Sequence, residues 1–287
     1  MAHILNMLNY GRNSKMNNNT CQGLISVVIS TYNWPDALKL VLTALNNQAD
    51  RNFEVIIVDD GSTSATKEMI EQFKTIAGFP LKHLWQEDKG FRAARARNLG
   101  IKHASGDYIV FLDGDCVPNI HFVENHRKIA ETNYFVVGHR IILSESYTQK
   151  VLQHQLTLWK KSSFEWMINA LCKNSNKLLP KLYVPFLNRY KKPNKWQGAK
   201  TCNLAFWKSD LLAVKGFDES FEGWGFEDSD LVIRILNHGK KRKSGKFATE
   251  VFHLWHKEAD RANESKNFDY LQQLLQTKRI HPANSEL

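Results

Sequence analysis

The strongest constraint on the fold is an alternation of short apolar runs with helix-like segments in the first half of the chain. Apolar runs of strand length cover residues 24–30, 53–58, 81–85 and 108–112, and segments with helical character (36–47, 63–76 and 91–104) lie between them. Strands connected in this way by helices run parallel, through right-handed crossovers. The sequence therefore predicts an α/β fold, with a Rossmann-like, mainly parallel central sheet flanked by helices.

The second half changes character and then returns to compact signals. After a predicted strand over 134–143, residues 145–195 hold ten Lys or Arg and only two acids, with apolar residues interleaved, which indicates basic, partly amphipathic helices. A strand over 203–207, a helix over 227–238, a strand over 247–254 and a terminal amphipathic helix follow. The predicted divisions are a polar segment 1–22, a first α/β half 23–143, a basic helical insertion 144–195, a second α/β half 196–256, and a C-terminal helix 257–287.

Composition limits the compartment and the partners. No apolar run approaches the ~18 residues that a membrane span needs, and the amino terminus lacks a basic-then-apolar signal. The four cysteines show no metal-ligand spacing. We expect a cytoplasmic protein. The net charge of +10 favours an anionic partner, either a substrate or the inner face of the cell membrane, and no nucleic-acid-binding module is recognisable.

A pair of carboxylates ends the fourth apolar run. Asp113 and Asp115 flank Gly114 where the run 108–112 leads into a turn, and ligands of open α/β sheets bind at the carboxyl ends of strands. Two carboxylates so spaced can share a divalent cation and leave its other positions to phosphate oxygens. The same residues also suit a plain turn.

The first two strands also end in polar residues. Thr31, Tyr32 and Asn33 follow the first strand, and Asp59 and Asp60 follow the second. Adjacent strand ends converge on one crevice, so these groups could contact a nucleobase and a ribose. A turn with a helix N-cap would use the same residue types.

The helix after Gly90 carries three arginines. Arg92 and Arg95 share a face, which suits contact with diphosphate oxygens, while Arg97 points elsewhere. Exposed arginines on an alanine-rich helix are ordinary, however. Asn98, near the inner face, is predicted to bond to the Asp113 turn.

Two further clusters lie near the carboxyl terminus. In the run 222–230, Trp224 stands between two glycines and is followed by Glu227 and Asp228, which begin a helix. The indole offers an apolar face to a sugar ring, whereas acids at a helix N-terminus are also favoured by the macrodipole alone. His253 and His256 follow a strand and could approach one ion if the segment turns.

Together these residues resemble a known series of motifs. The segments 30–33, 58–62, 96–100 and 113–115 resemble the motifs of family-2 glycosyltransferases with the GT-A fold. The run 223–228, Gly-Trp-Gly-Phe-Glu-Asp, resembles the carboxyl-terminal signature of β-1,4-galactosyltransferases, polypeptide N-acetylgalactosaminyltransferases and bacterial chondroitin polymerases. The resemblance covers residues 24–142 and 196–256, and the segment 144–195 matches no motif.

The resemblance implies a metal-dependent, inverting transfer from a UDP-sugar to a hydroxyl of a glycan or lipid-linked glycan acceptor, in bacterial surface polysaccharide synthesis. The donor would bind at Thr31, Tyr32, Asn33, Asp59, Asp60, Gly90, Arg97, Asp113, Gly114 and Trp224. Asp115, with His253 and His256, would hold Mn²⁺ or Mg²⁺. Asp228 would be the catalytic base, ionised at pH 7 without a large pKa shift, and Glu227 would hold donor or acceptor hydroxyls.

Other functions predict different residues. A nucleotidyltransferase or a dinucleotide oxidoreductase would need a glycine-rich loop after the first strand, where this chain has Thr-Tyr-Asn-Trp-Pro. A non-catalytic module that binds sugars or polyanions is the remaining alternative. Loss of a metal carboxylate or of the base would indicate such a module, but Asp113, Asp115 and Asp228 are all present.

Overall fold

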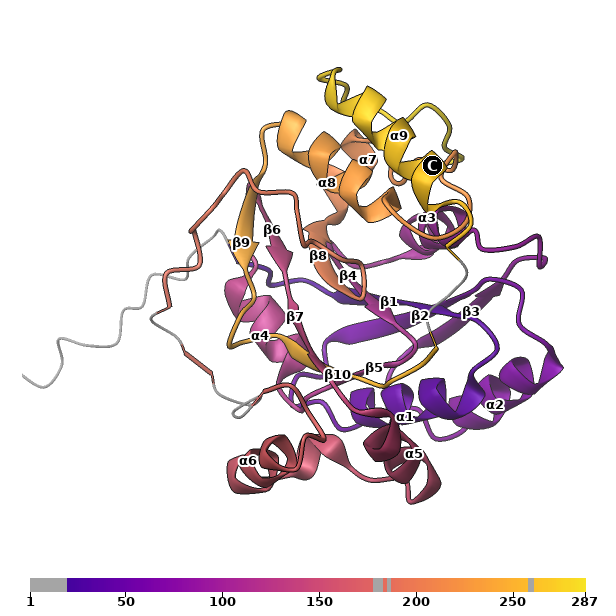
Figure 1. Ribbon diagram of the computed structural model, residues 1–287, viewed down its shortest axis with the longest axis vertical. Coiled ribbons are helices and arrows are strands. Elements are labelled where there is room, and N and C mark those ends of the chain that lie inside the picture. Colours follow the sequence, from indigo (N-terminus) through magenta and orange to yellow (C-terminus); the bar gives the residue numbers. More distant parts are fainter. Residues whose placement is uncertain (1–19, 178–182, 185–186, 258–260) are drawn as a thin grey trace, which may run out of the picture.

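The computed structural model describes residues 20–177, 183–184, 187–257 and 261–287, and its centre is a seven-stranded sheet (Figure 1). The strand order is β3-β2-β1-β4-β8-β6-β9. The strands are β1 (Ile25–Thr31), β2 (Phe53–Asp59), β3 (Leu81–Trp85), β4 (Tyr108–Asp113), β6 (Tyr134–Val137), β8 (Asn203–Trp207) and β9 (Lys241–Ser244). Only β8 pairs antiparallel with its neighbours. The predicted α/β fold with a mainly parallel sheet is confirmed.

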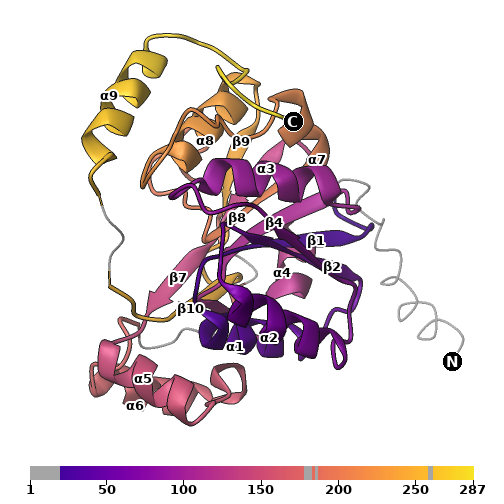
Figure 2. The same cartoon turned by 90° about the vertical axis from the view of Figure 1, so that its right-hand side faces the viewer.

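Helices cover both faces of this sheet, which gives three layers (Figures 1 and 2). On one face lie α1 (Pro35–Leu45) and α2 (Ser64–Lys74), and on the other lie α3 (Ala93–His103), α7 (Lys208–Ala213) and α8 (Glu227–Asn237). Helix α9 (Glu264–Leu275) packs outside α8. The helices α1, α2 and α3 are the three crossovers that the alternating pattern predicted.

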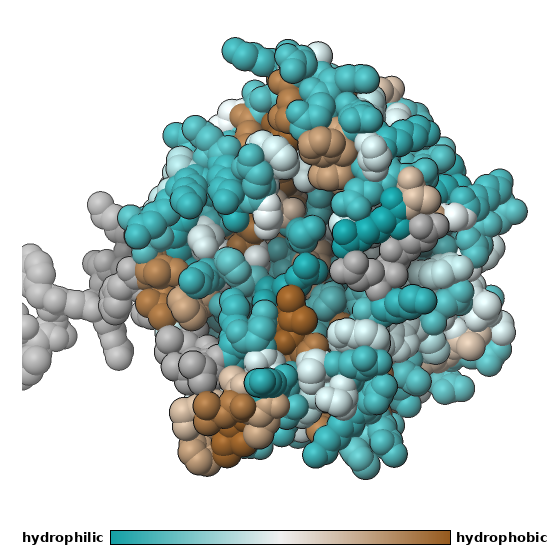
Figure 3. All heavy atoms as spheres, viewed as in Figure 1, coloured by the Kyte–Doolittle hydropathy of each residue, from teal (hydrophilic) through white to brown (hydrophobic). Residues whose placement is uncertain are grey.

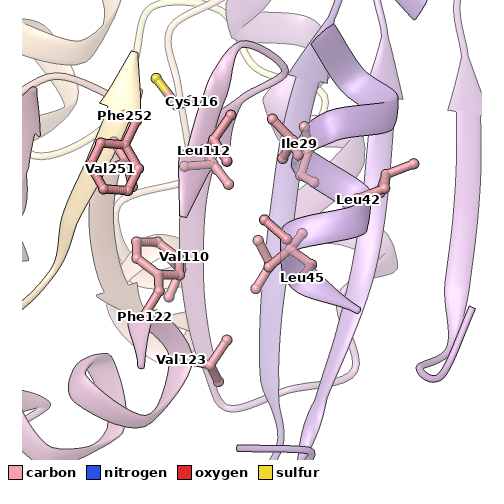
Figure 4. Packing of buried hydrophobic residues seen from close by; sticks show 14 of the residues in the cluster. Ile29, Leu42, Leu45, Val110, Leu112, Cys116, Phe122, Val123, Val251 and Phe252 are labelled. Atoms are coloured by element: carbon pink, nitrogen blue, oxygen red, sulfur yellow. The ribbon is translucent and has the colours of Figure 1, made fainter. Parts of the chain in front are cut away.

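The two faces of β1 belong to separate hydrophobic cores because side chains alternate along a strand. Ile25, Val27 and Ile29 pack with α1 and α2, whereas Val28 packs with α3. Figure 4 shows the first core, in which side chains of α1, β1 and β4 meet. Burial on both faces explains why these strands are almost continuously apolar.

A second, three-stranded sheet adjoins the first. It contains β5 (Cys116–Pro118), β10 (Glu250–His253) and β7 (His139–Ile142), with β10 in the middle, and α4 (Phe122–Ile129) follows β5. Neither β5 nor α4 was predicted. This sheet brings the end of the chain's last strand beside the turn that follows β4.

The single strand expected over 134–143 is wrong. It is divided at Gly138 into β6, which pairs in the central sheet, and β7, which pairs in the small sheet. The side chain of Asn203 lies so close that a Cβ at position 138 would overlap its carboxamide group. Glycine therefore permits the close approach at which the chain changes sheets.

The insertion is helical only in its first part. It contains α5 (Glu145–Gln153), a 3-10 turn (Leu158–Lys160) and α6 (Ser163–Leu171), and its described residues beyond 171 form no helix, contrary to the expectation for 144–195. Residues 178–182 and 185–186 of the insertion, and 1–19 of the polar segment, lie outside the described residues. In the part of the chain that the structure describes, no helix has the length and apolar character to cross a bilayer.

Candidate functional site

Two adjoining cavities open at the carboxyl ends of β1 and β4. The main cavity, of about 640 Å³, is lined by residues of the β1 and β4 ends and of the segment after β10, and the side cavity, of about 190 Å³, is lined by residues around the start of α8. Both are lined by Phe91, Arg97, Asp113, Arg140 and Trp224. The shared residues make the two cavities parts of one cleft.

The register of the small sheet brings Asp115 and the two histidines together. His253 pairs with Cys116 across β10 and β5, and the backbone N–H of Leu254 donates to the carbonyl of Asp115 at 3.0 Å. His253 Nε2 consequently lies 3.8 Å from Asp115 Oδ2, and His256 Nε2 lies 3.1 Å from the same oxygen. The three predicted metal ligands thus share one position at the wall of the main cavity.

The donor set of this cluster fits a divalent metal ion. Asp115 Oδ1 is buried and accepts no hydrogen bond, so it has a lone pair available for a cation. Burial favours a higher pKa for Asp115, but the hydrogen bond from His256 and the charges of the two imidazoles outweigh it and lower the pKa. Burial lowers the pKa of His253, which favours the neutral imidazole that binds metals.

His256 and Cys116 differ from His253 in their protonation. The hydrogen bond with Asp115 raises the pKa of His256 to about 9, so a metal must displace a proton there. Cys116 Sγ also lies in a group of ligand-type atoms with Asp115 and His253. Burial raises the pKa of that thiol well above its usual value, so a metal would have to displace a proton there as well.

Arg97 connects the β4 turn to α8. Its Nη1 donates to Glu227 Oε1 at 2.9 Å, and its Nη2 lies 3.6 Å from Asp113 Oδ1. Burial favours a lower pKa for Arg97, but the charges of Glu227 and Asp113 outweigh it and raise the pKa. Burial raises the pKa of Asp113 to about 6. The sequence predicts that Arg97 points away from Arg92 and Arg95. In the structure its side chain lines the cleft.

Asp228 lines the side cavity from the first turn of α8. Gly225 at φ +107° and Phe226 at φ 74° turn the chain sharply into the helix, and a left-handed conformation is uncommon for a residue as bulky as phenylalanine. Burial and the neighbouring charge of Glu227 raise the pKa of Asp228 to about 7. The expectation of a carboxylate without a large pKa shift is therefore wrong, because the side chain is desolvated.

Trp224 lines both cavities, and two cations lie near its ring. The ring centroid lies 4.5 Å from Arg261 Cζ and 5.7 Å from Lys200 Nζ. Lys200 also lines the side cavity, and its charge counteracts the rise in the pKa of Asp228. The indole is thus held as a flat apolar surface beside Asp228.

The ends of β1 and β2 contribute the predicted donor-binding residues Thr31, Tyr32 and Asp60 to the main cavity, together with Ser30 and Trp34. Asp60 accepts a hydrogen bond from the backbone N–H of Arg92 at 2.7 Å, and burial raises its pKa. Tyr32 is exposed and donates to Asp88. Gly114, which also lines the cavity, lies beside Thr31.

Asp59 and Asn33 do not line either cavity. Asp59 is buried beneath the turn, where its carboxylate accepts from the backbone N–H of Ser62 at 2.8 Å and lies 3.0 Å from His83 Nε2. Asn33 accepts from the backbone N–H of Thr63 at 2.8 Å. Both residues shape the strand ends that carry Tyr32 and Asp60.

The segment around α3 differs from its predicted contacts. Gly90 is exposed beside the cleft but outside its lining. The side chain of Arg92 donates to the carbonyl of Glu87, and Arg95 pairs with Glu286 at the surface, so neither arginine reaches the cavities. Asn98 donates to the carbonyl of Phe217 at 2.9 Å and not to the Asp113 turn.

Sequence reasoning missed four basic residues of the cleft: Arg140 from β7, Lys200 before β8, Lys257 after His256 and Arg261 before α9. Arg140 and Lys200 stand singly in their segments, which gives no local pattern that would reveal them. Lys257 directly follows the histidine pair, and its position next to candidate metal ligands was a usable signal.

Solved structures share the fold of this chain. An S. aureus TarS fragment, 1-349, superposes with a TM-score of 0.58 at 15% identity, covering 92% of this chain and 66% of that one. The mannosyltransferase PcManGT from Pyrobaculum calidifontis, in complex with GDP-Man and Mn²⁺, gives a TM-score of 0.53 at 18% identity, covering 88% of this chain and 62% of that one. The fold is that of the GT-A glycosyltransferases.

Curated relatives are longer than this chain. A chondroitin synthase from Escherichia coli is 28% identical in an alignment of 236 residues that covers 75% of this chain and 32% of the relative. A validoxylamine A glucosyltransferase from Streptomyces hygroscopicus subsp. limoneus is 30% identical in an alignment of 226 residues that covers 75% of this chain and 48% of the relative. The chain thus spans about a third of the first protein and about half of the second.

Two family models match overlapping parts of the chain. The model described as the N-terminal domain of galactosyltransferase matches residues 183–257, which contain the start of α8 and the histidine pair. The model described as glycosyl transferase family 2 matches residues 26–201, which is more than half of the chain. This protein belongs to glycosyl transferase family 2.

Proposed function

We propose that the chain is a metal-dependent, inverting glycosyltransferase that moves a sugar from a UDP-sugar to a hydroxyl of a glycan acceptor. The observation that carries this proposal is the arrangement of two acidic groups in one cleft. Asp115 with its histidines lies in the main cavity, and Asp228 lies in the side cavity beside Trp224. Such a transfer needs a metal ion that stabilises the leaving diphosphate and a base that deprotonates the acceptor hydroxyl.

The main cavity would bind the donor. Tyr32 and Asp60, with Thr31, would contact the uracil and ribose, and Gly114 leaves room beside them. Asp115, His253 and His256 would hold the metal ion, with Asp113 at the ribose or at a metal-bound water. The two imidazoles favour Mn²⁺ over Mg²⁺, whose sites are built almost wholly from oxygen. The ion would neutralise the charge that develops on the departing diphosphate.

The side cavity would bind the acceptor. Trp224 would pack against the acceptor sugar, and Glu227, fixed by Arg97, would hold sugar hydroxyls. Asp228 would accept the proton of the acceptor hydroxyl while that oxygen forms its bond to the anomeric carbon. The bond from that carbon to UDP breaks on the opposite face, so the configuration inverts. A pKa of about 7 matches a base that works near neutral pH.

Similar proteins support the substrate class. The S. aureus TarS fragment has been solved with UDP and with UDP-GlcNAc, and GalNAc-T7 has been solved with UDP, GalNAc and Mn²⁺. Named relatives include the chondroitin synthase and a hyaluronan synthase from Pasteurella multocida, at 27% identity over 75% of this chain and 23% of that protein. We accordingly propose a role in bacterial surface polysaccharide synthesis, at the inner face of the cell membrane.

A UDP-release screen tests the function. Each UDP-sugar is presented singly with Mn²⁺ to the wild type and to Asp228→Asn, since many transferases slowly hydrolyse their donor without an acceptor. We expect one sugar to stand out and to name the donor. Absence of release from every sugar, together with absence of UDP binding by calorimetry, would contradict the proposal. Heparin binding without metal would then favour a polyanion-binding module.

A further inference from the structure

Helix α6 presents an apolar face to solvent. Phe164, Met167, Ile168 and Leu171 follow the i, i+3, i+4, i+7 spacing of one helix face. Their exposed fractions are 64%, 36%, 44% and 71%. Figure 3 shows the resulting hydrophobic patch at the end of the molecule where α6 lies in Figure 1. A contiguous patch of this kind indicates an interaction surface, whereas scattered exposed apolar residues do not.

The opposite face of α6 fixes the helix in this orientation. Trp166 is fully buried and stacks on Phe252 of β10, with ring centroids 4.3 Å apart and an interplanar angle of 5°. Asn169 is also buried, and Ser162 caps the helix in a reciprocal hydrogen-bonded box with Glu165. The apolar face is therefore held outward by a packed inner face.

Exposed basic residues precede and follow α6 in the chain. Residues 144–177, which carry α5 and α6, contain five lysines and only two acids, Glu145 and Glu165. Lys150, Lys160 and Lys173 are exposed. An apolar helix face flanked by lysines matches the two properties of an anionic lipid surface, an acyl boundary and negative headgroups.

We propose that the apolar face of α6 and its flanking lysines bind an anionic membrane surface. A second copy of the chain fits less well, because it would bring the same lysines, on a chain of net charge +10, against each other. Phe164 and Leu171 would enter the boundary between headgroups and acyl chains, with the lysines at the phosphates. Binding of this kind needs no substrate, so its test is independent of the proposed transferase activity.

The membrane-binding face is connected to the wall of the main cavity. The backbone N–H of Leu143 donates to the carbonyl of His253 at 3.0 Å, and that of Trp255 donates to the Thr148 hydroxyl in α5 at 2.9 Å. The segment that carries the two histidines is therefore hydrogen-bonded to residues at the start of the insertion. Membrane binding through α6 would place the cleft close to the lipid surface.

Vesicle co-sedimentation of the full chain tests the proposal, with phosphatidylglycerol–phosphatidylcholine vesicles and with pure phosphatidylcholine vesicles. We expect binding to the anionic vesicles, weakened by salt, and at least tenfold weaker binding by Phe164→Ser/Leu171→Ser. Both side chains are mostly exposed, so the variant keeps its fold. Ile76→Ser/Leu212→Ser is the matched control, because it removes two exposed apolar residues elsewhere and should bind as the wild type does.

Charge reversal tests the electrostatic part. Lys160→Glu/Lys173→Glu should weaken binding to anionic vesicles by about fivefold per lysine or more, whereas Lys67→Glu/Lys102→Glu, with the same change in net charge, should have a much smaller effect.

A fluorescent dye on Cys172 reports directly on insertion of the helix end into lipid. Cys172 is an exposed thiol one residue beyond α6, so the emission of a polarity-sensitive dye attached to it should shift to the blue with anionic vesicles. The proposal would be overturned if the control variants lost as much vesicle binding as the α6 variants, or if the wild type did not bind vesicles. A dimer that Phe164→Ser/Leu171→Ser dissociates would identify the face as a contact between copies.

Discussion

Arg97 Nη1 donates a hydrogen bond to Glu227 Oε1 at 2.9 Å, although the two residues are 130 positions apart in the chain. The same guanidinium lies 3.6 Å from Asp113, at the turn after β4. One buried cation thus sets the position of the acidic turn relative to the helix that carries Asp228. The two halves of the cleft are joined by this contact.

Arg97→Met should destabilise the protein by about 3–5 kcal/mol, because it leaves the buried carboxylate of Glu227 and the half-buried carboxylate of Asp113 without their cation. Urea denaturation measures the change in the free energy of unfolding. Adding Glu227→Gln should recover part of the loss, since one of the unpaired charges is then removed. Arg95→Met is the control: its ion pair with Glu286 is exposed, so the cost should stay below about 1 kcal/mol. An equal loss of unfolding free energy in Arg97→Met and Arg95→Met would contradict the role of Arg97 as a bridge between the β4 end and α8.

Asp228→Asn should reduce transfer by about 10²–10⁴-fold, because the amide cannot accept the proton of the acceptor hydroxyl. Donor binding should persist, since Asp228 lines the side cavity and not the main one. Transfer is followed by product formation, and donor binding by calorimetry with Mn²⁺. Asp36→Asn, in the first turn of α1, is a matched change that should leave both unaffected. Retained transfer in Asp228→Asn would refute its role as the base.

The rate of transfer should fall as the pH is lowered through about 7. Burial raises the pKa of Asp228 to about 7, and only the ionised carboxylate is a base, so the rate should lose about tenfold per pH unit below that value. The residual activity of Asp228→Asn should lack this acid limb. A wild-type rate that is constant between pH 5 and pH 8 would show that the carboxylate is not the titrating base.

Hydrophobic pattern predicted the elements whose side chains alternate or repeat regularly. The four parallel strands and α1, α2 and α3 follow from that periodicity. Strand β9, with sequence Lys-Arg-Lys-Ser, carries no apolar signal because it is an edge strand, and α7 has only six residues. The division at Gly138 depends on the approach of Asn203, which is distant in the sequence.

The candidate site was predictable where it depends on strand ends. Asp60, Asp113 and Asp115 lie in or beside the cleft because parallel strands end at one edge of the sheet. The inward position of Arg97 depends on how α3 packs against α8, and the burial that raises the pKa of Asp228 depends on the loop around Trp224. Such tertiary features leave no local pattern.

Metal binding should depend on pH through His256. Its hydrogen bond with Asp115 raises the pKa of His256 to about 9 in the metal-free protein, and a metal ligand must be unprotonated. The affinity for Mn²⁺ should therefore rise about tenfold per pH unit from about pH 7 towards 9 and then level off. Electron paramagnetic resonance of free Mn²⁺ measures this without substrate, and EDTA should abolish transfer until Mn²⁺ is restored.

His256→Ala separates this mechanism from a general effect of charge. The variant should bind Mn²⁺ more weakly, because a ligand is lost, and with a flatter pH dependence, because the competing proton is lost as well. His121→Ala, at an exposed histidine that pairs with Glu124 and lines neither cavity of the cleft, should keep both the affinity and the slope of the wild type. An unchanged slope in His256→Ala would mean that another group releases the proton, and unchanged affinity would remove His256 from the metal site.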